Sequence, residues 1–161
     1  MSARAGIGYD SHRFNVGRPL RLGGITVPHT HGLIGHSDGD VVLHAITDAL
    51  LGAAALGDIG SMFPDDDPQW KGADSAGFVR GAVQALGAAG LAVNQVDVTI
   101  LAERPKLAPH IAGMRAATAR ALGVPVESVS IKAKTNEGMG WVGRGEGIGA
   151  IAVATIREAG G

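Results

Sequence analysis

Hydrophobic and polar residues alternate along several stretches of the chain, as they do in β-strands that bury one face. Gly6 to Phe14 predicts a first strand, although polar residues interrupt its apolar positions. Regular alternation over Val96 to Glu103 and over Val129 to Thr135 predicts two more strands. Ile148 to Ile156 is almost continuously apolar, and this pattern predicts a last strand that is buried on both faces.

Apolar residues spaced three and four apart predict three helices between these strands. Val41 to Leu56 is apolar on most sides, so this helix should be buried. A second helix is expected to begin at Asp74 or Ser75 and to end near Gly90, and a third covers His110 to Leu122. This mixture of strands and helices predicts an α+β fold with helices packed on a sheet.

The segment that precedes the first helix carries turn and capping signals. Arg21 to Pro28 predicts a short hairpin, and His29 to Gly35 predicts a loop. Ser37 and Asp38 are expected to cap the helix, with Asp40 in its first turn, where a carboxylate suits the helix dipole.

Composition narrows the class of protein. A length of 161 residues predicts a single domain over residues 1–161. A net charge of −1 gives no reason to expect nucleic-acid or membrane binding. The N-terminus has no apolar run of signal-peptide length, so a cytoplasmic location is expected. Because the chain has no cysteine, a bound metal must take its ligands from His, Asp or Glu.

Three residues form a candidate metal site. Asp10 and His12 are two apart on a predicted strand, so their side chains point to the same face. His44 lies in the most apolar helix, where a lone histidine is more often a hydrogen-bonded core residue. Together with Asp10 and His12, however, it completes three ligands, and three ligands with an open fourth position are typical of catalytic zinc.

Other residues near this site allow alternatives. Asp40 and Asp48 share a helix face with His44, and either carboxylate is a candidate to orient the imidazole. His29 and His31 are a rival pair of metal ligands with the same spacing, although a solvated loop is the expected setting for them. His36 is a candidate substrate contact.

Phosphate-binding chemistry is concentrated after the third predicted strand. Lys134 and Thr135 are candidates to hold phosphate oxygens, and Glu137 is a candidate Mg²⁺ ligand. Arg144, between glycines, is either a turn residue or an anion contact. The sequence contains no P-loop motif, so ATP-dependent transfer by that route is not supported.

Two further segments suit a nucleotide. Asp58, in Gly57 to Gly60, is either a turn residue or an acceptor for both hydroxyls of a ribose. Arg104 to Leu107 follows a predicted strand and is a candidate base-binding loop.

Several motifs in order along nearly the whole chain resemble the 2-C-methyl-D-erythritol 2,4-cyclodiphosphate synthase family. The specific stretch runs from His36 to Gly60 and includes the sequences HSDGD, DALLGA and GDIG. Phe63-Pro64-Asp65, Arg104-Pro105-Lys106 and Gly143 to Gly147 extend the resemblance. The chain departs from many members at Asn136, where a hydroxyl residue is common, and at Ile151, which is acidic in some relatives.

The resemblance implies a ferredoxin-like sheet with helices on one face, a homotrimer with active sites between adjacent subunits, and one Zn²⁺ per chain. It implies Asp10, His12 and His44 as zinc ligands, Glu137 as the ligand of Mg²⁺ or Mn²⁺ bridging the substrate phosphates, and His36 and Thr135 as catalytic groups. From its spacing to His44, Asp48 is the residue expected behind the zinc ligands. The implied substrate-binding residues are Ser37, Asp58, Ile59, Gly60, Phe63, Pro64, Asp65, Asp66, Asp67, Ala102, Glu103, Arg104, Pro105, Lys106, Leu107, Ala108, Lys134, Asn136, Trp141 and Arg144.

The activity that the resemblance implies belongs to non-mevalonate isoprenoid precursor synthesis. The 2-phosphate of 4-diphosphocytidyl-2-C-methyl-D-erythritol 2-phosphate attacks its own β-phosphorus, CMP leaves, and a cyclic diphosphate forms. Two alternatives use the same residues. One is a zinc-dependent phosphodiesterase with water as nucleophile, and the other is a non-enzymatic trimer that binds isoprenoid diphosphates.

Overall fold

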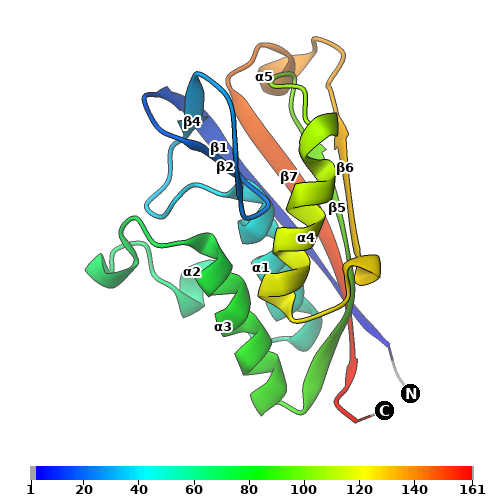
Figure 1. Ribbon diagram of the computed structural model, residues 1–161. Helices are drawn as coiled ribbons and strands as arrows, with labels where there is room; N and C mark the ends of the chain where they lie inside the picture. The colour runs from blue at the N-terminus through cyan, green and yellow to red at the C-terminus, as the bar shows by residue number, and fades with distance from the viewer. Residues whose placement is uncertain (1–2, 161) are drawn as a thin grey trace.

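A computed structural model describes residues 3–160, which form one mixed sheet, a small hairpin and a set of helices (Figure 1). The strands are β1 (Arg4–Val16), β2 (Leu20–Leu22), β3 (Ile25–Val27), β4 (His31–Leu33), β5 (Leu91–Leu101), β6 (Val129–Lys134) and β7 (Gly147–Glu158). The α-helices are α1 (Val41–Ala54), α2 (Ile59–Met62), α3 (Ser75–Ala88), α4 (Ile111–Leu122) and α5 (Gly140–Gly143). Short 3₁₀ turns cover Pro68–Trp70, Ala108–His110 and Val126–Ser128.

The main sheet has the strand order β4-β1-β7-β5-β6. β5 and β6 run parallel, and the other neighbours run antiparallel. Helices α1, α3 and α4 lie on one side of the sheet in Figure 1, with α1 against β1 and β7 and α4 over β6. The aliphatic core fills the space between these helices and the sheet. The expected α+β architecture with helices on one face is therefore confirmed.

The connectivity differs from the ferredoxin-like order that the resemblance implied. A ferredoxin-like domain follows β-α-β-β-α-β. Here helices separate β1 from β5 and β5 from β6, whereas only the short α5 lies between β6 and β7. The main elements of the chain therefore follow the order β-α-β-α-β-β. The last strand, β7, enters the sheet between β1 and β5.

Helix α1 packs so closely on strand β1 that their backbones are in contact at two glycines. A Cβ atom at Gly8 would lie 1.9 Å from the carbonyl oxygen of Ala45, and one at Gly6 would lie 2.1 Å from that of Ala49. Only glycine fits at such positions, because any side chain would overlap the helix backbone. The two glycines therefore fix how closely the buried helix lies against the strand.

The structure revises several expectations about single elements. Residues 31–33 form an edge strand inside the predicted loop, because β1 extends to Val16 and pairs with them. Asp40, rather than Ser37 or Asp38, is the N-cap of α1. The last strand is not buried on both faces, since Ile151 is 37% exposed and Val153 is 41% exposed on the side without helices. The hairpin of β2 and β3 and the three long helices are confirmed.

We expect Gly8→Ala to lower the free energy of unfolding by roughly 1–3 kcal/mol, the usual cost of overpacking a core. The new methyl group must push α1 away from β1. Gly52→Ala is the matched control, because Gly52 is exposed on the same helix and a Cβ there meets only the Ile7 carbonyl oxygen at 4.0 Å. Urea unfolding followed by circular dichroism, at one protein concentration, measures both. A Gly8→Ala protein as stable as the parent would contradict the close-approach argument.

Candidate active site

The three predicted metal ligands meet at one point. Asp10 Oδ2 lies 2.8 Å from His12 Nε2 and 3.0 Å from His44 Nδ1, and the two imidazole nitrogens are 3.1 Å apart. Each side chain thus offers one donor atom to the same small volume. Within residues 3–160, this is the group of three His, Asp or Glu side chains with metal-binding spacing. The rival pair, His29 and His31, forms no such group there.

Elements β1 and α1 place these ligands. Asp10 and His12 follow Gly6 and Gly8 on the face of β1 that contacts the helix, and His44 precedes Ala45 in α1, the residue that Gly8 contacts. The strand-face argument from the sequence therefore describes the geometry correctly. The spacing of the ligands depends on the close contact between strand and helix.

Charge is concentrated on Asp10. Burial disfavours its charged form, yet hydrogen bonds and charge attraction from His12 and His44 outweigh burial and lower the pKa of Asp10 from 3.8 to about 2. Burial also disfavours the charged form of His12 and lowers its pKa, but the hydrogen bond that His12 donates to Asp10 and the charge of Asp10 outweigh burial, so the pKa of His12 is raised. Asp10 is thus a carboxylate at neutral pH, and it can accept a hydrogen bond or bind a cation.

The ring nitrogen of His44 that points away from this cluster contacts two buried hydroxyl groups. His44 Nε2 lies 2.8 Å from Ser75 Oγ and 3.0 Å from Ser37 Oγ. Ser75 in turn donates a short hydrogen bond to the Asp38 carboxylate. In the sequence, Ser75 and Asp38 look only like helix caps, and no local pattern predicts their contact with this histidine.

The two acidic residues on the face of α1 do not orient His44. Asp40 is fully buried and accepts hydrogen bonds from the N–H groups of Gly23 (2.9 Å), Gly24 (2.8 Å) and Leu43 (3.1 Å). Asp48 accepts a hydrogen bond from the N–H of Ile59 (2.7 Å) rather than from the imidazole. Its carboxylate holds the start of α2, and its expected role behind the metal ligands stays a prediction.

A hollow of about 290 Å³ opens beside the three ligands. The predicted substrate residues that line it are His36, Ser37, Ile59, Gly60, Phe63 and Asp65, and Trp70 and Phe78 complete its wall. Phe63, Trp70 and Phe78 contact one another as an aromatic cluster. The hollow thus joins a polar floor to an apolar side wall.

Other residues predicted near this hollow lie at its margin. Asp58 is exposed and caps α2 by accepting hydrogen bonds from the N–H and hydroxyl of Ser61 (2.8 and 2.7 Å), which lower the pKa of its carboxyl. Asp67 caps the turn at Pro68–Trp70, and its carbonyl oxygen lies 3.3 Å from His36 Nε2. Pro64 and Asp66 are exposed in the same loop.

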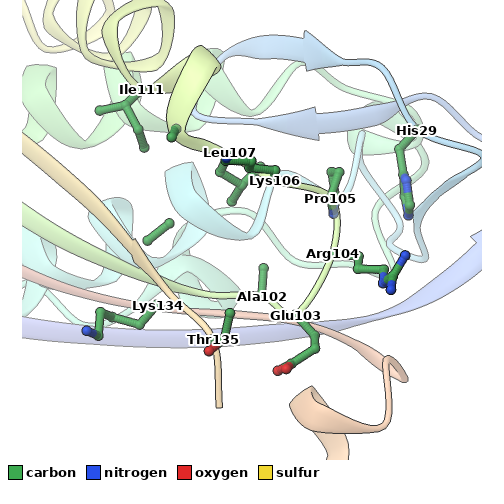
Figure 2. A pocket seen from close by; sticks show the side chains of 12 residues that line it. His29, Ala102, Glu103, Arg104, Pro105, Lys106, Leu107, Ile111, Lys134 and Thr135 are labelled. Atoms are coloured by element: carbon green, nitrogen blue, oxygen red, sulfur yellow. The ribbon is translucent and has the colours of Figure 1, made fainter. Parts of the chain in front are cut away.

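A second cleft, of about 690 Å³, lies at the ends of β5 and β6 (Figure 2). In Figure 2 the loop after Ala102 runs along the cleft, with His29 and Arg104 toward one side and Lys134 and Thr135 toward the other. The predicted nucleotide residues that line it are Ala102, Glu103, Arg104, Pro105, Lys106, Leu107, Ala108, Lys134 and Thr135. Ile111, Ala133 and His29 complete the lining.

The carboxylate of Glu103 holds the loop that follows β6. Its two oxygens accept hydrogen bonds from the N–H groups of Asn136 (3.1 Å) and Gly138 (3.2 Å). Glu137, between them, has a positive φ of 52°. Thr135 Oγ1 lies 3.3 Å from Glu137 Oε1, so the two predicted phosphate and metal residues are neighbours.

Trp141 and Arg144, which were also predicted to bind substrate, line neither hollow. Trp141 packs on Gly149 of β7 and lines a separate depression with Tyr9, Ser11 and His12. Arg144 forms an exposed ion pair with Glu146 (2.8 Å). Among residues 3–160, no residue lines both the hollow beside Asp10, His12 and His44 and the cleft at the ends of β5 and β6. Within that same range, no helix has the length and apolar character needed to cross a membrane.

The chain is similar to known proteins over nearly its whole length. The sequence profile of the YgbB family matches residues 3–157. A 2-C-methyl-D-erythritol 2,4-cyclodiphosphate synthase from Burkholderia cenocepacia (strain HI2424) is 56% identical over 161 residues, which is 100% of both chains. The enzyme of that name from Salinibacter ruber is 58% identical over 156 residues, covering 97% of this chain and 99% of its own.

Solved structures share the fold. A CDP-bound form of 2C-methyl-D-erythritol-2,4-cyclodiphosphate synthase is 40% identical with a TM-score of 0.88, over 96% of this chain and 100% of that one. The bifunctional IspDF from Campylobacter jejuni is 36% identical with a TM-score of 0.94, over 98% of this chain and 42% of that one. The chain therefore belongs to the YgbB family.

Proposed function

We propose that this chain converts 4-diphosphocytidyl-2-C-methyl-D-erythritol 2-phosphate into 2-C-methyl-D-erythritol 2,4-cyclodiphosphate and CMP, in non-mevalonate isoprenoid precursor synthesis. The observation that carries this proposal is the convergence of Asp10, His12 and His44 on the floor of an open hollow. The names of relatives that are more than half identical over nearly the whole of both chains support it.

The donor set fits a catalytic zinc ion. Two imidazole nitrogens and one carboxylate oxygen are ligands that zinc prefers, and the hollow beside them leaves room for a fourth ligand from the substrate. We assign Glu137 to a second cation, Mg²⁺ or Mn²⁺, because its exposed carboxylate adjoins the cleft proposed for the nucleotide. The two cations, when bound, would supply Lewis acids that offset charge on the substrate phosphates.

The two hollows would hold opposite ends of one substrate. The loop from Ala102 to Ala108 would hold the cytidine, with Asp58 accepting the ribose hydroxyls. The metal hollow, walled by Phe63 and Ile59, would hold the methylerythritol phosphate. Anchoring both ends keeps the chain of the substrate bent, and such positioning is worth on the order of 7–11 kcal/mol in favourable intramolecular reactions.

No strong base is needed for the chemical step. The nucleophile is an oxygen of the 2-phosphate, which is already anionic at neutral pH. Its attack on the β-phosphorus forms one P–O bond as the bond between the β-phosphorus and the CMP oxygen breaks. His36 and Thr135 would donate hydrogen bonds to oxygens that gain charge at this point, which is how fixed donors accelerate transfer reactions.

A homotrimer would bring the two halves of the site together. The face of the sheet without helices exposes Ile7 (70%), Tyr9 (55%), Ile151 and Val153, and monomeric proteins rarely leave such apolar patches open. We propose that this face is covered by neighbouring copies in a cytoplasmic trimer of single catalytic domains. The metal hollow of one subunit would then meet the nucleotide cleft of the next.

The reaction itself distinguishes this function from its alternatives. Purified protein incubated with the cytidine substrate should give CMP and the cyclic diphosphate, followed by ³¹P resonance. A linear phosphate product would identify a phosphodiesterase that uses water. Substrate that is bound but unchanged, with metal present, would identify a binding protein.

His44→Ala should lose both zinc and activity while the protein stays folded, because the variant removes one of three ligands. Zinc content measured by elemental mass spectrometry, together with circular dichroism, tests this expectation. The matched control is the double variant His29→Ala and His31→Ala, which should keep its zinc. Full metal content in His44→Ala, or loss of zinc in the control, would show that the ligand set is wrong.

Asp58→Ala should weaken CDP binding by about tenfold or more while zinc content is unchanged, since a charged acceptor for the ribose hydroxyls is lost. Calorimetric titration with CDP measures the effect. Ser61→Ala is the control for the cap of α2, because it removes a hydrogen-bond partner of Asp58 but keeps the carboxylate. Equal CDP affinity in Asp58→Ala and the parent protein would remove the ribose role.

Mixing two inactive variants tests the shared site. His12→Ala damages the metal half, and the double variant Thr135→Ala with Lys106→Ala damages the nucleotide half. A cyclic trimer has head-to-tail interfaces, so every site joins two chains, and random reassembly should restore roughly a quarter of the parent activity. Native mass spectrometry must first show hybrid trimers. If hybrids form and the activity stays at background, the site is not shared between subunits.

A further inference from the structure

The imidazole of His44 is held from its far side by a chain of buried polar groups. Nδ1 faces Asp10 and His12, whereas Nε2 faces the N-terminal end of α3. Ser75, at that end, is fully buried, and its Oγ is 2.8 Å from Nε2. Neither Ser75 nor Asp38 has a place in the reaction or the metal site described above.

The direction of each hydrogen bond follows from the number of protons available. The Asp38 carboxylate accepts hydrogen bonds from the Ser75 hydroxyl, the Ser75 N–H (3.1 Å) and the Asp40 N–H (3.0 Å), and an ionised carboxylate can only accept. The one hydroxyl proton of Ser75 is therefore directed to Asp38. The Ser75 oxygen must then accept from His44, which requires a proton on Nε2.

With a proton on Nε2, Nδ1 is the ring nitrogen left to bind a metal ion, which would take the place of the hydrogen bond from Nδ1 to Asp10. We propose that Ser75 and Asp38 are positioning residues that hold His44 as the Nε2–H tautomer and so prepare Nδ1 to bind the metal ion. The chain also places the negative charge of Asp38 behind the imidazole, through one hydroxyl. Partners of this kind fix the ring of a ligating histidine and strengthen it as a ligand. The inference rests on the metal centre proposed above.

Helix capping does not account for these contacts. The N-cap of α3 is Asp74, whose carboxylate accepts a hydrogen bond from the N–H of Ala76 (3.0 Å). Ser75 is the first residue within the helix, so its hydroxyl is not needed for the cap. The segment before α1 and the segment before α3 are also joined by two backbone hydrogen bonds. They run from Asp38 N–H to the Ala73 carbonyl (3.0 Å) and from Gly72 N–H to the His36 carbonyl (2.8 Å). The hydroxyl can therefore be removed while the segments remain joined.

The test is zinc affinity, measured by competition with a chromophoric chelator at one fixed pH. Ser75→Ala should bind zinc roughly 10–100-fold more weakly than the parent protein, the range found when partners of ligating histidines are removed. Asp74→Ala, which removes the cap of the same helix, should bind zinc as the parent does. Ser75→Ala with the affinity of the parent, or an equal loss in both variants, would overturn the inference.

A measurement on the unaltered protein keeps the test independent of how the variants fold. In the zinc-loaded protein, ¹H–¹⁵N resonance of the His44 ring should show a proton on Nε2 that exchanges slowly with water. Zinc bound through Nε2, or no proton there, would refute the proposed tautomer. Failure of the parent protein to bind zinc would instead refute the metal centre itself, so the two failures are distinguishable.

Discussion

The contact between the backbones of β1 and α1 sets the geometry on which the site depends. Gly6 and Gly8 have no side chains to hold the strand away from the carbonyl oxygens of α1. Asp10 and His12 continue the same strand face, and the helix presents His44 at the matching height. A wider spacing between strand and helix would separate the three donor atoms, which lie about as far apart as the ligands of one ion do. A packing constraint in the core thus becomes a constraint on chemistry.

Buried polar groups extend this rigidity beyond the strand and helix. Asp40 is fully buried, which raises the pKa of its carboxyl, and three backbone N–H groups offset part of that cost. Two of these groups belong to the turn of the β2–β3 hairpin, so the hairpin is fixed to the start of α1. Among residues 3–160, every buried side-chain nitrogen or oxygen has a hydrogen-bond partner. A site built on such a network is held in place before any ligand arrives.

The sequence allowed the elements and the ligand cluster to be predicted for definite reasons. Alternation along β1 predicts that Asp10 and His12 share a face, and the structure shows them together with His44. Contacts between residues far apart in the chain leave no such pattern in the sequence. Ser75 looks like a capping residue, and only the packing of α3 on α1 brings it to His44. Asp48 lies on the face of His44 by spacing, but the fold of the following loop turns it toward Ile59. The position of β7 in the sheet likewise depends on strand pairing that no local pattern encodes.

The glycine-rich loop after β6 limits how an anion can bind in the proposed nucleotide cleft. Glu103 binds two of its N–H groups, so the loop that carries Thr135 and Glu137 is already anchored through its backbone. An anion that used those N–H groups would have to displace a carboxylate, whereas one held by side chains would leave the anchor intact. The second arrangement requires less rearrangement and leaves the Glu103 carboxylate stabilised by its two backbone hydrogen bonds. It also fits a cleft in which Lys106, Lys134 and Thr135 line the wall, because these side chains can meet phosphate oxygens while the loop keeps its shape.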